Sequence, residues 1–229
     1  MSRSLPVKRS GWEISFLGER ALTLSPELKG DCLADIHRIF RCLEKKEIPG
    51  VIDIVPAYEQ IAVIYRDPIP DIQLPAKAIF EAIEEAADQD FESRLFEVPV
   101  CYELGLDWDE VQDQTSLSKQ EIVRRHSSKI YTVAMMGFLP GFIYLSGLDR
   151  ELKCNRKEHP RTKIPCGAVG VGGMQTGIYA LESPGGWQII GRTPKLFFDV
   201  HQNPPIEIQP GDKIRFTPIS KQEFKEIES

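Results

Sequence analysis

Glycine and proline recur through the stretch Pro165-Cys-Gly-Ala-Val-Gly-Val-Gly-Gly-Met-Gln-Thr-Gly-Ile-Tyr179 and its continuation Ser183-Pro-Gly-Gly-Trp-Gln-Ile-Ile-Gly-Arg-Thr-Pro194. Glycine loses more conformational freedom on folding than other residues, so this density of glycine indicates backbone bends or close approaches that a Cβ would block. The stretch is therefore predicted to form a stiff binding surface. Its rigidly held polar and aromatic side chains are Gln175, Tyr179, Trp187 and Arg192.

The chain around this stretch, from Ile130 onward, predicts a β-rich domain. Gln209-Pro-Gly-Asp212 is a turn, because proline fixes φ and glycine supplies the left-handed position. No helix is expected before about Ser220. Short β-like runs separated by glycine and proline, typical of a compact barrel or sandwich, occupy residues 131–136, 168–171, 187–190, 206–208 and 213–218.

Two short helices are predicted ahead of this β-rich region. One covers residues 107–114. The other is opened by Ser118 and Glu121, which fit the S-x-x-E capping box.

The N-terminal half predicts a different fold. Residues 11–102 follow the order strand, strand, helix, strand, strand, helix, strand. The first helix is predicted to start at Ser25, the second follows Pro75, and the β-branched runs 51–55 and 61–65 form a hairpin. This order indicates an α+β arrangement with two helices on one face of an antiparallel sheet, similar to a ferredoxin-like fold.

Composition excludes several classes of protein. The 229 residues carry a net charge of −6, whereas a nucleic-acid-binding surface needs a strong basic excess. Residues 1–20 lack the apolar run of a signal peptide. The most apolar window, residues 131–145, is shorter than the roughly 20 residues that cross a bilayer. We therefore expect a cytoplasmic protein of two domains.

Five cysteines are scattered without a C-x-x-C pair, so the sequence predicts neither a disulfide framework nor a zinc site. Most of them are predicted to be small buried hydrophobic residues. Cys166 lies within the glycine-rich stretch and is a weak candidate for a nucleophile. The candidate bases nearest to it along the chain are His126 and His159.

Three arginines are candidates for binding an anion. Arg156, Arg161 and Arg192 stand near prolines and glycines, and a guanidinium held in this way suits a carboxylate or a phosphate. The alternative for each is a surface ion pair worth at most about 1 kcal/mol, and Glu182 is a candidate partner. No G-x-x-x-x-G-K-[ST] loop occurs, and Gly170-Val-Gly-Gly173 only loosely resembles a dinucleotide fingerprint.

Aromatic residues and one histidine leave two alternatives each. Trp187 follows two glycines, which could leave one face of its ring open to a flat ligand or partner. Phe138, Phe142 and Tyr144 could line a pocket but are favoured as core residues. His126, near the end of a short helix, is either a base or a favourable charge at the helix C-terminus, and the second role is favoured.

Four motifs, in this order, resemble one known family. They are Gly137-Phe-Leu-Pro-Gly-Phe-Ile-Tyr-Leu-Ser-Gly-Leu-Asp149, His159-Pro-Arg-Thr-Lys-Ile-Pro165, Gly172-Gly-Met-Gln-Thr-Gly-Ile-Tyr179, and Ser183-Pro-Gly-Gly-Trp187 with Ile190-Gly-Arg-Thr-Pro194. The sequence resembles the KipI / allophanate hydrolase subunit 1 family, which includes the PxpB subunit of 5-oxoprolinase. The resemblance implies an α+β N-terminal domain over residues 1–102. It also implies an all-β, cyclophilin-like barrel over residues 103–229, with a short helical lead-in.

The resemblance implies a subunit of an ATP-dependent 5-oxoprolinase complex, which opens the lactam of 5-oxoproline to L-glutamate and is active only when assembled. The implied partners are a biotin-dependent-carboxylase-like subunit (PxpC/KipA type) and a LamB/YcsF-type subunit (PxpA). ATP then binds either this chain or a partner. Two alternatives stay open: an inhibitor that binds a sensor histidine kinase, as KipI does, and a carboxyltransferase or allophanate hydrolase subunit in urea breakdown.

The predicted site follows from the resemblance and the residue types together. Opening a lactam with ATP requires positive and hydrogen-bonding groups that hold a carboxylate, a transferred phosphoryl group, or both. In this hypothesis the arginines supply charge, Gln175 orients an amide edge, and Tyr179 and Trp187 shape the wall. No metal is predicted. The predicted catalytic residues are Arg161, Arg192 and His126, and the predicted substrate-binding residues are Gln175, Tyr179, Ser183, Gly185, Gly186 and Trp187.

Overall fold

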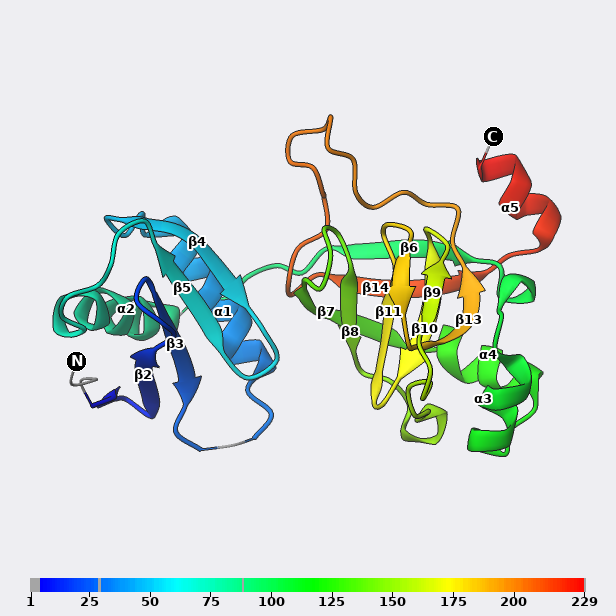
Figure 1. Ribbon diagram of the computed structural model, residues 1–229, viewed down its shortest axis with the longest axis horizontal. Coiled ribbons are helices and arrows are strands. Elements are labelled where there is room, and N and C mark those ends of the chain that lie inside the picture. Colours follow the sequence, from blue (N-terminus) through cyan, green and yellow to red (C-terminus); the bar gives the residue numbers. More distant parts are fainter. Residues whose placement is uncertain (1–4, 29, 88, 229) are drawn as a thin grey trace. The chain divides into compact units, whose positions relative to one another are not determined.

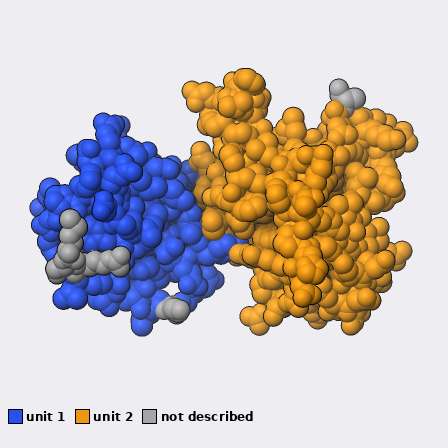
Figure 2. Space-filling view, in the orientation of Figure 1, with its two compact units in different colours: residues 1–92 blue, residues 93–229 orange. Residues whose placement is uncertain are grey.

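The computed structural model describes residues 5–28, 30–87 and 89–228, and the chain forms two compact units, residues 1–92 and 93–229 (Figure 2). The strands of the first unit form one antiparallel sheet in the order β1-β2-β3-β5-β4. Its elements are β1 (Val7–Arg9), β2 (Trp12–Phe16), β3 (Ala21–Pro26), α1 (Leu33–Lys45), β4 (Val51–Pro56), β5 (Ile61–Tyr65) and α2 (Gln73–Ala86).

Alternation along the strands builds the core of the first unit. Successive side chains of a strand point to opposite faces, so every second residue faces the core. Ile14 on β2, Leu22 and Leu24 on β3, and Ile61 and Val63 on β5 are fully buried in this way. They join buried residues of α1 and α2 in one hydrophobic cluster. Both helices therefore pack on the same face of the antiparallel sheet, as the sequence predicts.

The first helix begins later than predicted. The structure starts α1 at Leu33, with Cys32 in the N-cap position. Ser25 and Pro26 instead end β3, where they pair with β2. The predicted cap at Ser25 is wrong because these residues extend the strand ladder, and a proline is tolerated at a strand end. The predicted hairpin of β4 and β5 is confirmed.

The second unit is a mixture of sheet and helix. It contains a main seven-stranded sheet in the order β13-β10-β11-β8-β7-β14-β6 and a separate two-stranded sheet of β12 and β9. Its elements are β6 (Leu95–Val100), η1 (Tyr102–Leu104), α3 (Trp108–Thr115), α4 (Lys119–Ser127), β7 (Ile130–Met136), β8 (Ile143–Ser146), η2 (Arg150–Leu152), β9 (Arg161–Ile164), β10 (Ala168–Gly172), β11 (Gln175–Ile178), β12 (Ser183–Gly185), β13 (Gln188–Arg192), β14 (Lys213–Pro218) and α5 (Lys221–Glu228).

The main sheet curls so that its two edges meet at one end (Figure 1). Cys101, which follows β6, and Arg192, which ends β13, form an isolated antiparallel bridge. The Cys101 amide donates to the Arg192 carbonyl over 2.8 Å, and the Arg192 amide donates back over 3.1 Å. The result is a half-barrel. Its membership of the cyclophilin-like class stays a prediction.

Strand β6 belongs to the second unit, although the sequence pattern placed it in the domain over residues 1–102. It pairs in parallel with β14, from Leu95 opposite Lys213 to Val100 opposite Pro218. Val98 and Val100 are fully buried in the cluster that forms the core of the second unit. The second unit therefore begins at Ser93, and the first sheet lacks the strand that a ferredoxin-like arrangement expects from this segment.

The helical lead-in forms as predicted, but several strands differ. The Ser118 hydroxyl accepts a hydrogen bond from the Glu121 amide over 3.3 Å at the start of α4. Residues 206–208 are not a strand and lie in the loop between β13 and β14. Strands β8, β9, β11 and β12 were not predicted, because strands of three or four residues leave little periodicity to detect.

A fragment of residues 93–229 is expected to fold by itself, whereas residues 103–229 are expected to be several kcal/mol less stable. The shorter fragment lacks β6, and burial of each valine side chain contributes about 1.5–3 kcal/mol. Urea unfolding followed by circular dichroism measures the difference. Equal midpoints for the two fragments would contradict the assignment of β6 to this core.

Candidate functional site

A pocket of about 360 Å³ opens on the second unit. Its walls come from the β7–β8 loop and β8, from the segment before β9, from the residue after β11, and from the connection between β12 and β13. Four of the predicted site residues meet here, namely Tyr179, Gly185, Gly186 and Trp187. The other lining residues are Phe138, Phe142, Tyr144, Arg156, Lys157, Pro160 and Pro184.

Phe142 stands at the centre of the aromatic lining. Its ring makes edge-to-face contacts with Tyr179 at 4.8 Å, Trp187 at 5.5 Å and Phe138 at 5.8 Å between centroids. Such pairs contribute about 0.5–1.5 kcal/mol each beyond their buried area. Phe142 is 1% exposed and serves both core and pocket, whereas Phe138 is 66% exposed, so its prediction as a core residue is wrong.

Two glycines of the quoted stretch are required by these aromatic rings. A Cβ on Gly172 would lie 2.9 Å from ring carbons of Trp187, and a Cβ on Gly185 would lie 2.5 Å from the Tyr179 hydroxyl oxygen. The close approach that the sequence indicates is therefore an approach by the protein's own side chains. Trp187 is only 5% exposed, so most of its ring is already covered.

Arg156 brings a positive charge to the mouth of the pocket. Its guanidinium carbon lies 5.6 Å from the centroid of the Trp187 ring. Within the described residues, no carboxylate forms an ion pair with it. Arg156 is exposed, and a guanidinium without an acidic partner can bind a carboxylate or a phosphate through paired donors.

Arg161 is held by Asp107 and does not line the pocket. Both terminal nitrogens of Arg161 donate to the Asp107 carboxylate, one of them over 2.8 Å. Burial of Asp107 opposes its charged form, but hydrogen bonds from Arg161, the Ile189 amide and Lys157 outweigh burial and lower the pKa of this carboxyl. Arg161 therefore serves the scaffold beside the pocket.

Arg192 is also engaged elsewhere. Its Nε donates to the Cys166 carbonyl over 2.8 Å, and its Nη2 lies 3.1 Å from a carboxylate oxygen of Glu228 on α5. Its guanidinium carbon also stands 5.3 Å from the ring centroid of Phe224. The structure does not bring Arg192 to the pocket.

His126 lies in the core of the second unit. The Thr176 hydroxyl donates to the Gly170 carbonyl, so its oxygen accepts from His126 Nε2 over 2.9 Å. Nδ1 then accepts from the Tyr102 hydroxyl over 2.7 Å. Burial lowers the pKa of His126 to about 3, which keeps the imidazole neutral. The charge at the end of α4 that was the favoured prediction for His126 is therefore absent.

The remaining candidates lie outside the pocket. Gln175 starts β11 opposite Gly172, and Ser183 starts β12 with its hydroxyl donating to the Pro184 carbonyl. Glu182 pairs with Lys163 at 3.0 Å instead of an arginine. Cys166 is half-buried, and burial raises the pKa of its thiol, which disfavours the thiolate that a nucleophile requires.

The site contains residues that the predicted site did not include. Arg156 belongs to the arginine set that the sequence singled out, but nothing in the sequence distinguishes it from Arg161. Phe142 and Tyr144 follow the alternation of a half-buried strand, which is also the pattern of ordinary core residues. Lys157 carried no signal beyond its place between two motifs.

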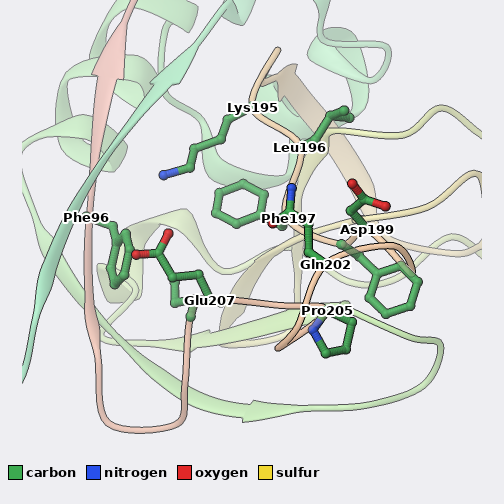
Figure 3. A pocket seen from close by; sticks show the side chains of 10 residues that line it. Phe96, Lys195, Leu196, Phe197, Asp199, Gln202, Pro205 and Glu207 are labelled. Carbon is green, nitrogen blue, oxygen red and sulfur yellow. The ribbon is translucent and has the colours of Figure 1, made fainter.

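A second, smaller pocket of about 110 Å³ lies under the loop between β13 and β14 (Figure 3). The ammonium of Lys195 stands 5.2 Å from the ring centroid of Phe96 and 5.5 Å from that of Phe197. Asp199 and Glu207 also line this pocket. None of the predicted site residues lies here, so the larger pocket is the better candidate.

Two other kinds of feature are absent from the described residues. Residues 5–28, 30–87 and 89–228 contain no group of three or more His, Cys, Asp and Glu that could hold a metal ion. In the same part of the chain, none of the helices has both the length and the apolar character needed to span a membrane.

Comparison with known proteins shows extended similarity. The family model of the carboxyltransferase domain, subdomain C and D, matches residues 12–208. The PxpB-type 5-oxoprolinase subunit of Bacillus subtilis (strain 168) is 34% identical over 228 residues, covering 93% of this chain and 95% of that protein. The corresponding 5-oxoprolinase subunit of Escherichia coli O157:H7 is 39% identical over 206 residues, covering 88% and 94%.

A solved structure shows the same fold. The crystal structure of TTHA0988 matches with a TM-score of 0.75 and 32% identity over 88% of this chain. The match covers 40% of TTHA0988, so this chain corresponds to less than half of that protein.

The stability of the protein is expected to fall as the pH drops from 6.5 toward 3. The unfolded chain protonates His126 at its ordinary pKa of 6.5, while the folded chain keeps it neutral down to about 3. Within this window the loss approaches about 1.4 kcal/mol per pH unit for this group. The variant His126→Gln removes the titration, so the stability advantage of wild type over the variant should shrink between pH 7 and pH 5. A constant difference in urea unfolding would contradict a buried, neutral His126.

Proposed function

The chain belongs to the carboxyltransferase-domain family of KipI and the PxpB subunit of 5-oxoprolinase, and on this premise we propose that it serves as one subunit of an ATP-dependent 5-oxoprolinase. The complex opens the lactam of 5-oxoproline to L-glutamate. Support comes from two 5-oxoprolinase subunits that align with this chain over 94% or more of their length. The subunits proposed to join it are a biotin-dependent-carboxylase-like subunit (PxpC/KipA type) and a LamB/YcsF-type subunit (PxpA).

The reaction explains why ATP is required. A lactam carbonyl is a poor electrophile at neutral pH, so the γ-phosphoryl group of ATP is transferred to the lactam oxygen, and ADP leaves. Water then adds to the activated carbon, the ring C–N bond breaks to release the amine, and phosphate departs to leave the new carboxylate. The protein must position the ring and stabilise negative charge on the substrate and the phosphoryl group. Nucleotide binding is assigned to the assembled complex.

The pocket on the second unit is proposed to hold 5-oxoproline, and the unpaired guanidinium of Arg156 carries this assignment. 5-Oxoproline is a small flat ring with one carboxylate. The aromatic lining around Phe142 suits the ring, and Arg156 at the pocket mouth suits the carboxylate. Tyr179 and Trp187 keep the wall-forming role predicted for them from the sequence, whereas Arg161 and Arg192 act through the scaffold.

Glutamate release from 5-oxoproline is expected to depend on this chain. The measurement compares ATP-dependent turnover by the reconstituted three-subunit mixture with the same mixture lacking this chain. Turnover should fall to the uncatalysed background without it. Equal turnover in its absence would reject the proposal and favour the inhibitor of a histidine kinase or the subunit of urea breakdown.

The change Arg156→Ala is expected to raise the KM for 5-oxoproline at least tenfold in the assembled complex. A hydrogen bond to a charged group contributes about 1.5–3 kcal/mol, and 1.4 kcal/mol corresponds to a factor of ten. Arg124→Ala is the matched control, because Arg124 is 65% exposed on α4 and pairs with Glu121 away from the pocket. A KM for Arg156→Ala within twofold of the control would remove Arg156 from the site.

A further inference from the structure

Asp107 joins three segments of the second unit through one buried carboxylate. Its side chain is 1% exposed. Arg161 donates to both carboxylate oxygens, Lys157 Nζ donates to Oδ1 over 2.9 Å, and the Ile189 amide donates to Oδ2 over 2.6 Å. These donors come from the segment before β9, from β9 itself, and from β13.

The start of α3 does not account for a carboxylate at position 107. Asp107 occupies the N-cap position of α3, where an aspartate usually accepts a hydrogen bond from an amide in the first turn of its own helix. Asp107 makes no such bond. Its carboxylate is directed at the pocket walls instead.

The contacts of Asp107 lie on both walls that carry the functional groups of the pocket. Lys157 directly follows Arg156 in one wall, and Ile189 lies two residues after Trp187 in the other. The Lys157 amide also donates to the Gly186 carbonyl over 2.6 Å, which ties the same two walls along the backbone. The spacing of the Arg156 guanidinium from the Trp187 ring therefore depends on what holds these walls together.

The charges around Asp107 balance one another. Lys157 and Arg161 supply two positive charges, and Asp107 and Glu110 supply two negative ones, with Glu110 also accepting from Lys157. Arg156 is not part of this group. The cluster therefore fixes the walls without competing for the charge at the pocket mouth.

We infer that Asp107 is a positioning residue, which holds Arg156 and Trp187 at the spacing that a small carboxylated ring requires. The inference rests on the proposed function of the pocket. Arg161 takes part through its two bonds to Asp107, which gives it a role at the site without contact with the ligand.

The test compares Asp107→Asn with Asp212→Asn in the assembled complex. Asp212 is a matched control, because its side chain is also 1% exposed and accepts hydrogen bonds from an arginine side chain and from backbone amides. It lies in the turn before β14 and does not line the pocket. Asp107→Asn should raise the KM for 5-oxoproline at least fivefold with a smaller change in kcat, and Asp212→Asn should leave KM within twofold.

The conservative change Arg161→Lys supplies a variant that keeps the positive charge. Lysine replaces the paired bond with a single one, so an intermediate rise in KM is expected. This variant also tests the inference if Asp107→Asn does not fold. Wild-type KM in Arg161→Lys, together with either wild-type KM or no folded protein for Asp107→Asn, would overturn the inference.

A second measurement does not depend on turnover. Trypsin cleavage after Arg156 and Lys157 in the full chain, followed by mass spectrometry, should be at least tenfold faster in Asp107→Asn than in wild type or Asp212→Asn. If wild type opens no 5-oxoproline, the proposed function fails while this comparison still decides whether Asp107 holds the wall. Unchanged cleavage would overturn the inference, and faster cleavage with unchanged KM would leave Asp107 a purely structural residue and overturn it as well.

Discussion

The packing of the Trp187 indole on the glycine-bearing strand β10 is the contact on which the pocket depends. A side chain at Gly172 would place its Cβ 2.9 Å from the ring, so the strand can only carry glycine where the indole lies flat on it. Once seated, Trp187 supports Phe142 and Tyr144 in edge-to-face contacts at 5.5 Å and 5.7 Å. The aromatic lining is thus one packed unit, and its rigidity gives a small ring a fixed surface to bind.

The three arginines of the second unit differ in their partners and not in their chemistry. A guanidinium is always charged, so what surrounds it decides whether it can bind a ligand. Arg161 is neutralised by a buried carboxylate, and Arg192 bonds a carbonyl and pairs with Glu228 on the C-terminal helix. Arg156 contacts only an aromatic ring among these alternatives, so it alone of the three keeps its charge for a carboxylate.

The seam of the curled sheet and the pocket are linked through one segment. After β6, residues 101–107 run beside β13, first through the Cys101–Arg192 bridge and then through the Leu106 and Asp107 amides, which donate to the Ile189 carbonyl over 2.8 Å and 3.1 Å. This path places the Asp107 carboxylate against β13. The strand that closes one end of the half-barrel therefore also delivers the residue that ties the pocket walls together.

Local pattern was enough for the order of elements and for one wall of the site, but long-range contacts decided the rest. The sequence alone predicted the strand and helix order of residues 11–102, the capping box at Ser118, and the meeting of Tyr179, Gly185, Gly186 and Trp187, because these depend on periodicity or on neighbours in one glycine-rich stretch. Only the tertiary structure paired β6 with β14 and chose Arg156 over Arg161. That choice depends on Asp107, which lies 54 residues from Arg161 along the chain, and no local pattern encodes which carboxylate a guanidinium will meet at that separation.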